Sequence, residues 1–216
     1  AQTDYDTTTD LPIRTYANGV LQQTLAYAGD GTLSTVTDGL GHTTTLSNWH
    51  RGIPQSIQYA DSTSKTAVVN DSGWVTAVTD ENGFATGYGY DPMGRISSIV
   101  YPNADTTAWT PTASAFEQVA STEYGIPAGH WRQTVTTGNA TKTIYFDALW
   151  RPVVTREYDA GNVAGTTRFT RDAYDTMDHH VFASYPGTTD ALTTGTHTTY
   201  DALNRPLTSV QDSELG

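Results

Sequence analysis

Cysteine is absent from this chain of 216 residues, and lysine and arginine together number only 11. The absence of cysteine excludes disulfides, thiolate nucleophiles and cysteine-ligated metals. The shortage of basic residues leaves a net charge of -12, which repels the phosphate backbone of nucleic acids and anionic membrane surfaces. We therefore expect no nucleic-acid partner.

Long apolar runs are also missing, so we expect no membrane span. The N-terminal residues lack the basic start and apolar core of a signal peptide, so any export signal was removed or lay on a larger parent chain. Charged residues make up only 16% of the chain, which leaves a surface of threonine, serine, asparagine, glutamine and glycine. This composition is typical of secreted bacterial β-proteins, and we expect a secreted protein or one on the bacterial cell surface.

What the chain does contain favours an all-β class. Threonine is the commonest residue, and the 13 tyrosines and 19 glycines suit pleated strands and tight turns better than helices. Four glycines recur at intervals of 21 residues: Gly31, Gly52, Gly73 and Gly94. A second turn signal, such as residues 80–83, follows each by about ten residues. The pattern predicts one β-hairpin per repeat, regular over about residues 27–101.

Apolar residues recur two and five positions after each of these glycines, as at Ile96 and Ile99 after Gly94. In a regular strand, residues three apart face opposite sides of the sheet. A β-bulge between the two positions would return them to one face. A short extended segment leading into the strand would do the same, and the sequence is compatible with both.

A six-residue motif becomes clear in the second half of the chain: an aromatic residue, Asp, two variable residues, a turn residue and a base. We expect the aromatic to stack on its counterpart one repeat along, the Asp to cap the turn, Gly or Asn to supply positive φ, and the base to reach the carboxylate. The structural motif residues are Tyr90, Asp91, Gly94, Arg95, Phe146, Asp147, Arg151, Tyr174, Asp175, Tyr200, Asp201 and Arg205.

These motifs resemble the YD-repeat or Rhs-repeat family, whose units read roughly Tyr-Asp-x-x-Gly-Arg-Leu. The resemblance implies tandem β-hairpins in a curved, spiralling sheet that forms part of a hollow shell. In bacterial Rhs toxins and the BC components of Tc toxins such a shell encloses a toxic C-terminal domain, and in teneurins a similar barrel serves adhesion. At 216 residues the chain is short for a closed shell, so it resembles a fragment or a smaller relative.

We interpret residues 1–216 as a single repeat array, with an insertion at about residues 103–140 and looser repeats over residues 141–216. Within the insertion, residues 114–117 (Ser-Ala-Phe-Glu) resemble a capping box and predict a short helix before residues 125–127.

Chemical motifs are scarce, and we expect no catalytic residue, no metal site and no cofactor. The histidines lack HExxH spacing, GxSxG is absent, and no glycine pair precedes a predicted helix that could bind phosphate. His130, Trp131 and Arg132 form a candidate contact for carbohydrate or peptide. The competing interpretation, which we favour, is packing: strand alternation places His130 and Arg132 on one face and buries Trp131 on the other.

The leading functional hypothesis is a structural shell segment that encloses or presents a toxin or effector domain. Its partners would be neighbouring repeats or domains of a larger parent chain, a toxin cargo, and further copies joined through unpaired sheet edges. The alternative is a cell-surface adhesion module that recognises glycan or protein. An enzyme on a β-solenoid would need two facing carboxylates in a groove, which a sequence alone does not reveal.

Overall fold

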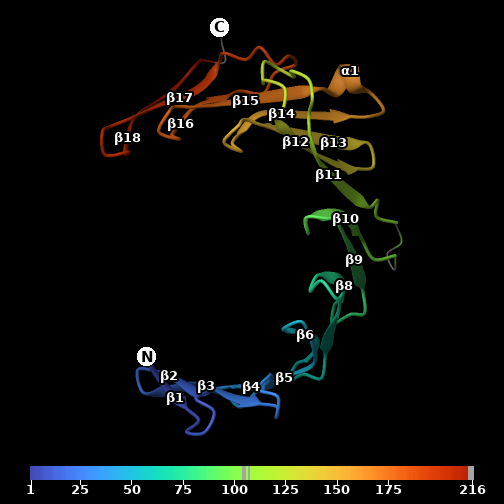
Figure 1. The fold of residues 1–216 in the computed structure, drawn as a ribbon, viewed down its shortest axis with the longest axis vertical. Coiled ribbons are helices and arrows are strands. Elements are labelled where there is room, and N and C mark those ends of the chain that lie inside the picture. Colours follow the sequence, from blue (N-terminus) through green and yellow to red (C-terminus); the bar gives the residue numbers. More distant parts are fainter. Residues whose placement is uncertain (104–105, 107, 214–216) are drawn as a thin grey trace. The chain divides into compact units, whose positions relative to one another are not determined.

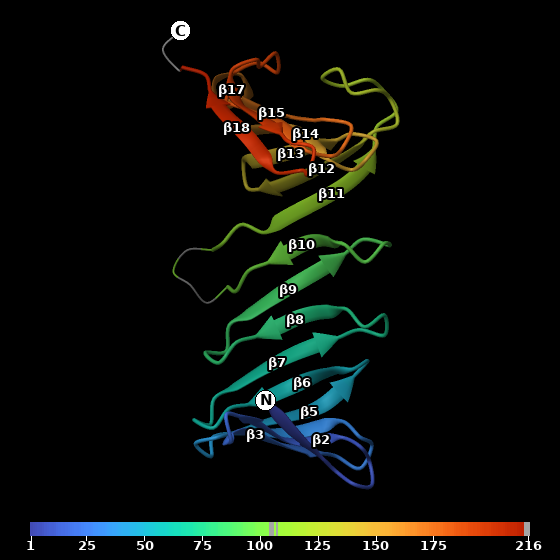
Figure 2. The same cartoon turned by 90° about the vertical axis from the view of Figure 1, so that its left-hand side faces the viewer.

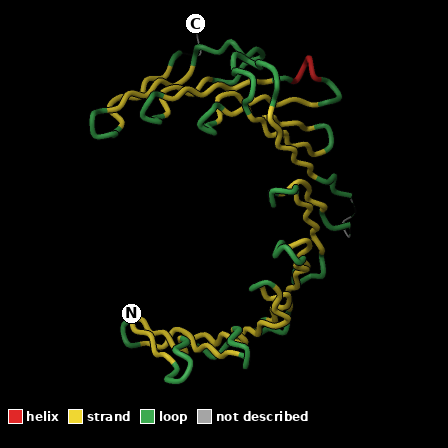
Figure 3. Tube along the Cα trace, viewed as in Figure 1, coloured by secondary structure: helices red, strands yellow, loops and turns green. Residues whose placement is uncertain are grey.

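The computed structural model describes residues 1–103, 106 and 108–213, and in these residues the regular secondary structure is almost entirely β-strand, connected by turns and loops (Figures 1 and 3). The all-β hairpin fold expected from the sequence is confirmed. Two units are distinguished, Ala1–Trp109 and Thr110–Gly216. No helix in the described residues is long and apolar enough to cross a membrane.

Unit 1 is an antiparallel meander in which each described strand pairs with the strand that follows it in the chain. Figure 2 shows these strands in chain order, from blue to green. They are β1 (Gln2–Tyr5), β2 (Pro12–Ala17), β3 (Val20–Tyr27), β4 (Leu33–Asp38), β5 (Thr43–His50), β6 (Ile53–Gln58), β7 (Ser64–Val69), β8 (Val75–Thr79), β9 (Ala85–Tyr90) and β10 (Ile96–Val100).

Unit 2 continues the same pattern of consecutive antiparallel pairs over its described strands. A single helical turn, α1 (Val163–Thr166), lies in one of its connections. The strands are β11 (Thr112–Gln118), β12 (Trp131–Thr137), β13 (Ala140–Phe146), β14 (Pro152–Asp159), β15 (Arg168–Tyr174), β16 (His180–Ser184), β17 (Gly195–Tyr200) and β18 (Pro206–Gln211).

Three of the four glycines at 21-residue intervals, Gly31, Gly73 and Gly94, occupy equivalent turns of unit 1, whereas Gly52 lies in the two-residue loop between the paired His50 and Ile53. The φ angles of all four lie between 78° and 83°, in the left-handed region that glycine enters without steric cost. At Gly94 the backbone N–H donates to the carbonyl of Asp91, which closes the turn at 2.9 Å. The repeat in the sequence is therefore a repeat in backbone conformation.

β-Bulges explain the three-residue spacing of the apolar positions. Tyr90 pairs with Ile96 and Gly89 with Ser98, so the residue between Ile96 and Ser98 is bulged. Ile99 then pairs with Tyr88, on the same face as the Tyr90–Ile96 pair. Equivalent shifts follow the turns at residues 28–32 and 70–74, whereas the β5–β6 register is regular. Of the two alternatives, the β-bulge is therefore the correct one in three of the four repeats, and the repeat of Gly52 is the exception.

The helix predicted at residues 114–117 is wrong. These residues belong to β11, which pairs with β12 along its whole length, from Thr112–Thr137 to Gln118–Trp131. Strand alternation places Phe116 against the ring of Trp131, at 5.2 Å between centroids. This tertiary contact outweighs the local capping signal. The described part of the predicted insertion also supplies β12, and residues 104, 105 and 107 lie outside the described residues.

The hydrophobic core of unit 2 consists of Ile126, Tyr145, Val154 and Phe169. Residues 119–130, the connection between β11 and β12, bring Ile126 onto the sheet face that carries the other three. Val154 is only 1% exposed. In unit 1, Val69 is the one buried apolar side chain among the described residues, so the two units differ in how much core they possess.

Candidate functional site

The Asp of each YD motif closes its turn with the same set of hydrogen bonds. In the Asp147 turn, Oδ1 accepts the backbone N–H groups of Leu149 (2.8 Å) and Arg151 (3.0 Å). Oδ2 accepts Nε of Arg151 at 2.8 Å. We call this arrangement the Asp clamp. It recurs with Arg95 at Asp91 and with Arg205 at Asp201.

Histidine takes the place of arginine in two further Asp clamps. Oδ2 of Asp175 lies 2.8 Å from Nδ1 of His179, and Oδ2 of Asp38 lies 2.8 Å from Nδ1 of His42. The Asp38 turn lies outside the motifs identified from the sequence. The sequence does contain a signal for this turn, because His42 follows Asp38 by four residues, as the base follows the Asp in every clamp.

Hydrogen bonding to the clamped carboxylates favours their charged form. The Arg205 side chain and then its backbone N–H lower the pKa of Asp201 from its ordinary value. At Asp175, the backbone N–H of His179 is the largest cause of a lowered pKa, and its ring adds to it. These carboxylates have a structural role, because the ionised Asp accepts the hydrogen bonds that close each clamp.

Successive motifs are joined by the sixth residue of one and the tyrosine of the next. The Arg151 guanidinium lies 4.7 Å from the Tyr174 ring centroid, and His179 stacks on Tyr200 at 4.3 Å. In unit 1, Trp74 holds the sixth position and packs on Tyr90 at 5.2 Å. At these three tyrosines, stacking on the base of the preceding motif, or on its substitute, replaces the predicted stacking on the counterpart aromatic, whereas Phe146 packs against Phe116 and Trp150.

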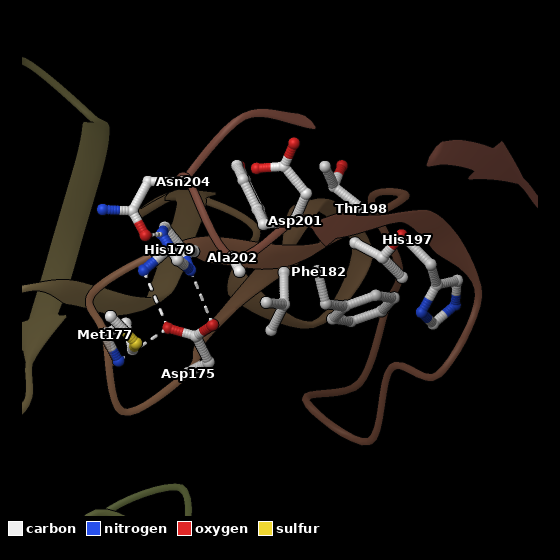
Figure 4. A pocket seen from close by; sticks show the side chains of 12 residues that line it. Asp175, Met177, His179, Phe182, His197, Thr198, Asp201, Ala202 and Asn204 are labelled. Atoms are coloured by element: carbon white, nitrogen blue, oxygen red, sulfur yellow. Dashed lines mark hydrogen bonds and ion pairs between the residues drawn. The ribbon is translucent and has the colours of Figure 1, made fainter. Parts of the chain in front are cut away.

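A pocket of about 610 Å³ lies between the last two hairpins of unit 2 and contains one of these joints (Figure 4). His179 connects Asp175 on one side to Asn204 on the other, with 3.1 Å between Nε2 and Oδ1 of Asn204. Both ring nitrogens are thus engaged within the protein. The arrangement joins two hairpins, and no group of three or more potential metal ligands occurs among the described residues.

The structure keeps His130 and Arg132 on one face of the sheet, where both lie beside Glu123, and places Trp131 on the other. Arg132 forms ion pairs with Glu117 (2.8 Å) and Glu123 (2.7 Å). Trp131 points to the opposite face and is only half-buried. His130, which precedes β12, is the buried member of the three. The prediction that Trp131 is the buried residue is corrected, because the connection at residues 119–130 covers the other face of the sheet.

Trp131 belongs to a cluster of stacked rings that we call the aromatic platform: Phe116, Trp131, Phe146 and Trp150. Trp150 lies parallel to Phe116, with 5.5 Å between centroids and 3° between planes, and 5.4 Å from Trp131. It is 55% exposed and has φ 65° at the turn position that Gly94 occupies in its own motif. The sequence linked only Trp131 to binding, since the platform is assembled from separate strands.

Comparison with known proteins agrees with this architecture. Residues 69–106 match the family model RHS Repeat. No curated protein matches the chain. The chain is similar to a solved structure of TcdB2-TccC3-TEV, with 12% identity over 96% of this chain and 13% of that chain, and a TM-score of 0.63.

Two further solved structures are similar at lower scores. The Photorhabdus luminescens Tc holotoxin pore with the TccC3 mutation D651A gives 10% identity over 99% of this chain and 13% of that chain, with a TM-score of 0.42. TcdB2-TccC3 without its hypervariable C-terminal region gives 13% identity over 99% and 14%, with a TM-score of 0.39.

The chain spans about 13% of the length of the TcdB2-TccC3-TEV chain, and at 12% identity the likeness concerns the fold. The RHS match covers Val69 to Thr106, which includes the Asp91 clamp and its bulge. The resemblance expected from the YD motifs is confirmed: residues 69–106 match the RHS Repeat model, within an all-β hairpin array whose fold is similar to that of TcdB2-TccC3-TEV.

Proposed function

We propose that this chain is a wall segment of an Rhs-type shell that encloses a toxin or effector polypeptide in a secreted complex. The observation that carries the proposal is the recurrence of Asp-clamped turns in two units whose described strands each pair with the next strand of the same unit. The RHS match and the fold likeness support a structural, non-catalytic role. Residues 1–216 would then act as one array within a longer chain, and the cargo would be supplied by that chain or by a partner.

Proteolysis of the full-length gene product tests the shell proposal. We expect a segment outside residues 1–216 to resist proteinase K in the native protein and to be cut readily after denaturation, because a closed wall excludes the protease. Fragments would be identified by mass spectrometry. A free peptide of the same sequence is the control. If every segment outside residues 1–216 is cut as fast as its free peptide, nothing is enclosed and the proposal fails.

The aromatic platform supports a second candidate function, recognition of a glycan at a cell surface. Trp150 adopts a positive φ where glycine would be unstrained, and more than half of its side chain is exposed. Strain of this kind is characteristic of binding sites. Flat, parallel rings present an apolar face on which a sugar ring can stack, and Gln118 and Gln133 lie in register with Trp131 and Phe116 on the same face.

Trp150→Gly separates binding from folding, because glycine adopts the left-handed conformation without strain. We expect the wild-type protein to bind on a glycan array and Trp150→Gly to lose at least about tenfold in affinity, in line with an aromatic contact residue. Leu149→Ala, in the same turn and 68% exposed in the native protein, is the matched control and should bind as wild type. Absence of wild-type binding, or undiminished binding by Trp150→Gly, argues against this function.

A further inference from the structure

The connection between β11 and β12 is a strap, residues 119–130, that lies on the core face of unit 2. Its ends are tied together, since Val119 N–H donates to the carbonyl of His130 at 2.8 Å. Further along, the Arg171 guanidinium donates to the carbonyl of Tyr124, and Ile126 enters the core. The strap is therefore a separate layer, attached to the sheet by a few identifiable contacts.

His130 is the most deeply buried titratable group of the strap, with a side chain only 2% exposed. Its Nδ1 lies 2.9 Å from the carbonyl oxygen of Pro127, which can only accept a hydrogen bond, so Nδ1 carries a hydrogen. Its Nε2 has no hydrogen-bond partner among the described residues and lies 3.4 Å from Oε2 of Glu123. Both nitrogens of this ring thus face acceptors.

A neutral imidazole has one donor and one acceptor nitrogen, and only the imidazolium donates from both. With Nδ1 committed to Pro127, the neutral ring of His130 turns a lone pair towards the Glu123 carboxylate. The protonated ring instead offers Glu123 a charge-assisted hydrogen bond, which is roughly twice as strong as a neutral one. The geometry around His130 is therefore complementary to the cation.

The titratable groups around His130 lie on the strap and on strands β11, β12 and β13. Glu123, on the strap itself, is also paired with Arg132 of β12, and Arg132 in turn pairs with Glu117 of β11. From β13, the ring of Tyr145 lies 6.1 Å from the His130 ring. Burial is the largest cause of a raised pKa at Tyr145, so this phenol stays neutral. Among the described residues, Glu123 is the one carboxylate within ion-pair distance of His130, and it supplies the negative charge that an imidazolium there requires.

We propose that His130 is a proton-operated latch for the strap. When the ring is protonated it binds Pro127 and Glu123 at once, and because His130 adjoins β12 and Glu123 is also paired with Arg132 of β12, these bonds hold residues 123–127 of the strap against the sheet. When the ring is neutral, the bond to Glu123 is lost and the strap opens more often, which exposes the core around Ile126. The strap is thus held more firmly in mildly acidic than in neutral or alkaline solution.

Hydrogen exchange of the intact protein measures strap opening directly. Exchange would be recorded at about pH 5.5 and about pH 8, on either side of the range in which histidines change charge. After correction for intrinsic exchange rates, we expect the amides of residues 119–130 to be about tenfold better protected at the lower pH, as for one hydrogen bond to a charged group. His130→Gln, which cannot be protonated, should lose this pH dependence.

Two variants keep the test decisive. Glu123→Gln removes the acceptor charge without altering the buried ring, and it should also remove the pH dependence, which decides the matter if His130→Gln does not fold. His180→Gln, which alters an exposed histidine paired with Asp172 at 2.6 Å, is the matched control and should retain it. Equal protection of the wild-type strap at both pH values, or pH dependence that persists in Glu123→Gln, overturns the proposal.

Discussion

Phe169→Ala is expected to lower the free energy of unfolding of unit 2 by about 3–5 kcal/mol. Phe169 is 7% exposed and belongs to the core with Ile126, Tyr145 and Val154. Its ring lies 5.3 Å from that of Tyr124, so its removal also takes away one contact between the strap and the sheet. Because unit 2 has few fully buried side chains, few neighbours can move to fill the cavity. Denaturant unfolding followed by tryptophan fluorescence measures the loss.

Leu203→Ala is the matched control for the core prediction. Leu203 is also a large apolar residue of unit 2, but it is 72% exposed at the tip of the β17–β18 turn. Its truncation should change the free energy of unfolding by no more than about 0.5 kcal/mol. If Phe169→Ala costs as little as Leu203→Ala, the cluster around Val154 does not stabilise the unit and our description of the core is incorrect.

Gly195→Ala is expected to destabilise unit 2 by about 1–3 kcal/mol through overpacking. A methyl group at Gly195 would overlap the carbonyl oxygen of Ala183 and lie 2.6 Å from Cα of Ser184. These are backbone atoms of the adjacent strand, so β16 and β17 would have to separate. The same glycine accepts the backbone N–H of Asp212 at 2.9 Å, and the disturbance should therefore extend to the end of β18.

Gly29→Ala provides the comparison for this effect. A methyl group at Gly29 has no atom within 4 Å, and the residue does not need a positive φ. We expect this change to be neutral or to stabilise by up to about 1 kcal/mol, because alanine restricts the unfolded chain. Thermal unfolding of the two variants side by side checks the prediction. Equal melting temperatures would show that β16 and β17 tolerate the extra methyl group.

The fold class could be predicted because it depends on local signals that repeat. Glycines such as Gly73 and Gly94 mark turns by their conformation, and the motif Asp carries its own hydrogen-bond acceptors, so one hairpin can be inferred without knowledge of its neighbours. The bulges were foreseen as one of two alternatives. A choice between the two alternatives requires the register of each pair of strands, which is set by contacts between the strands.

What could not be predicted depends on residues brought together from distant segments. The signal at residues 114–117 favours a helix locally, yet Phe116 is held in β11 by rings from β12 and from the turn at Trp150. The burial of His130 likewise follows from the path of the strap, which one sequence taken alone does not specify. The RHS resemblance was recognised from the motifs, whereas the coupling of Arg151 to Tyr174 was not.

The Asp clamp has a consequence for how such a chain reaches its native state. Every clamp joins residues no more than four positions apart, and within each unit every described strand pairs with its immediate successor, so strand pairing joins neighbouring segments of the chain. A hairpin can therefore close before the rest of the chain is ordered, and pairing can spread from it in either direction. Chains of this kind can gain or lose a hairpin during evolution while the remaining ones keep their own nucleation sites.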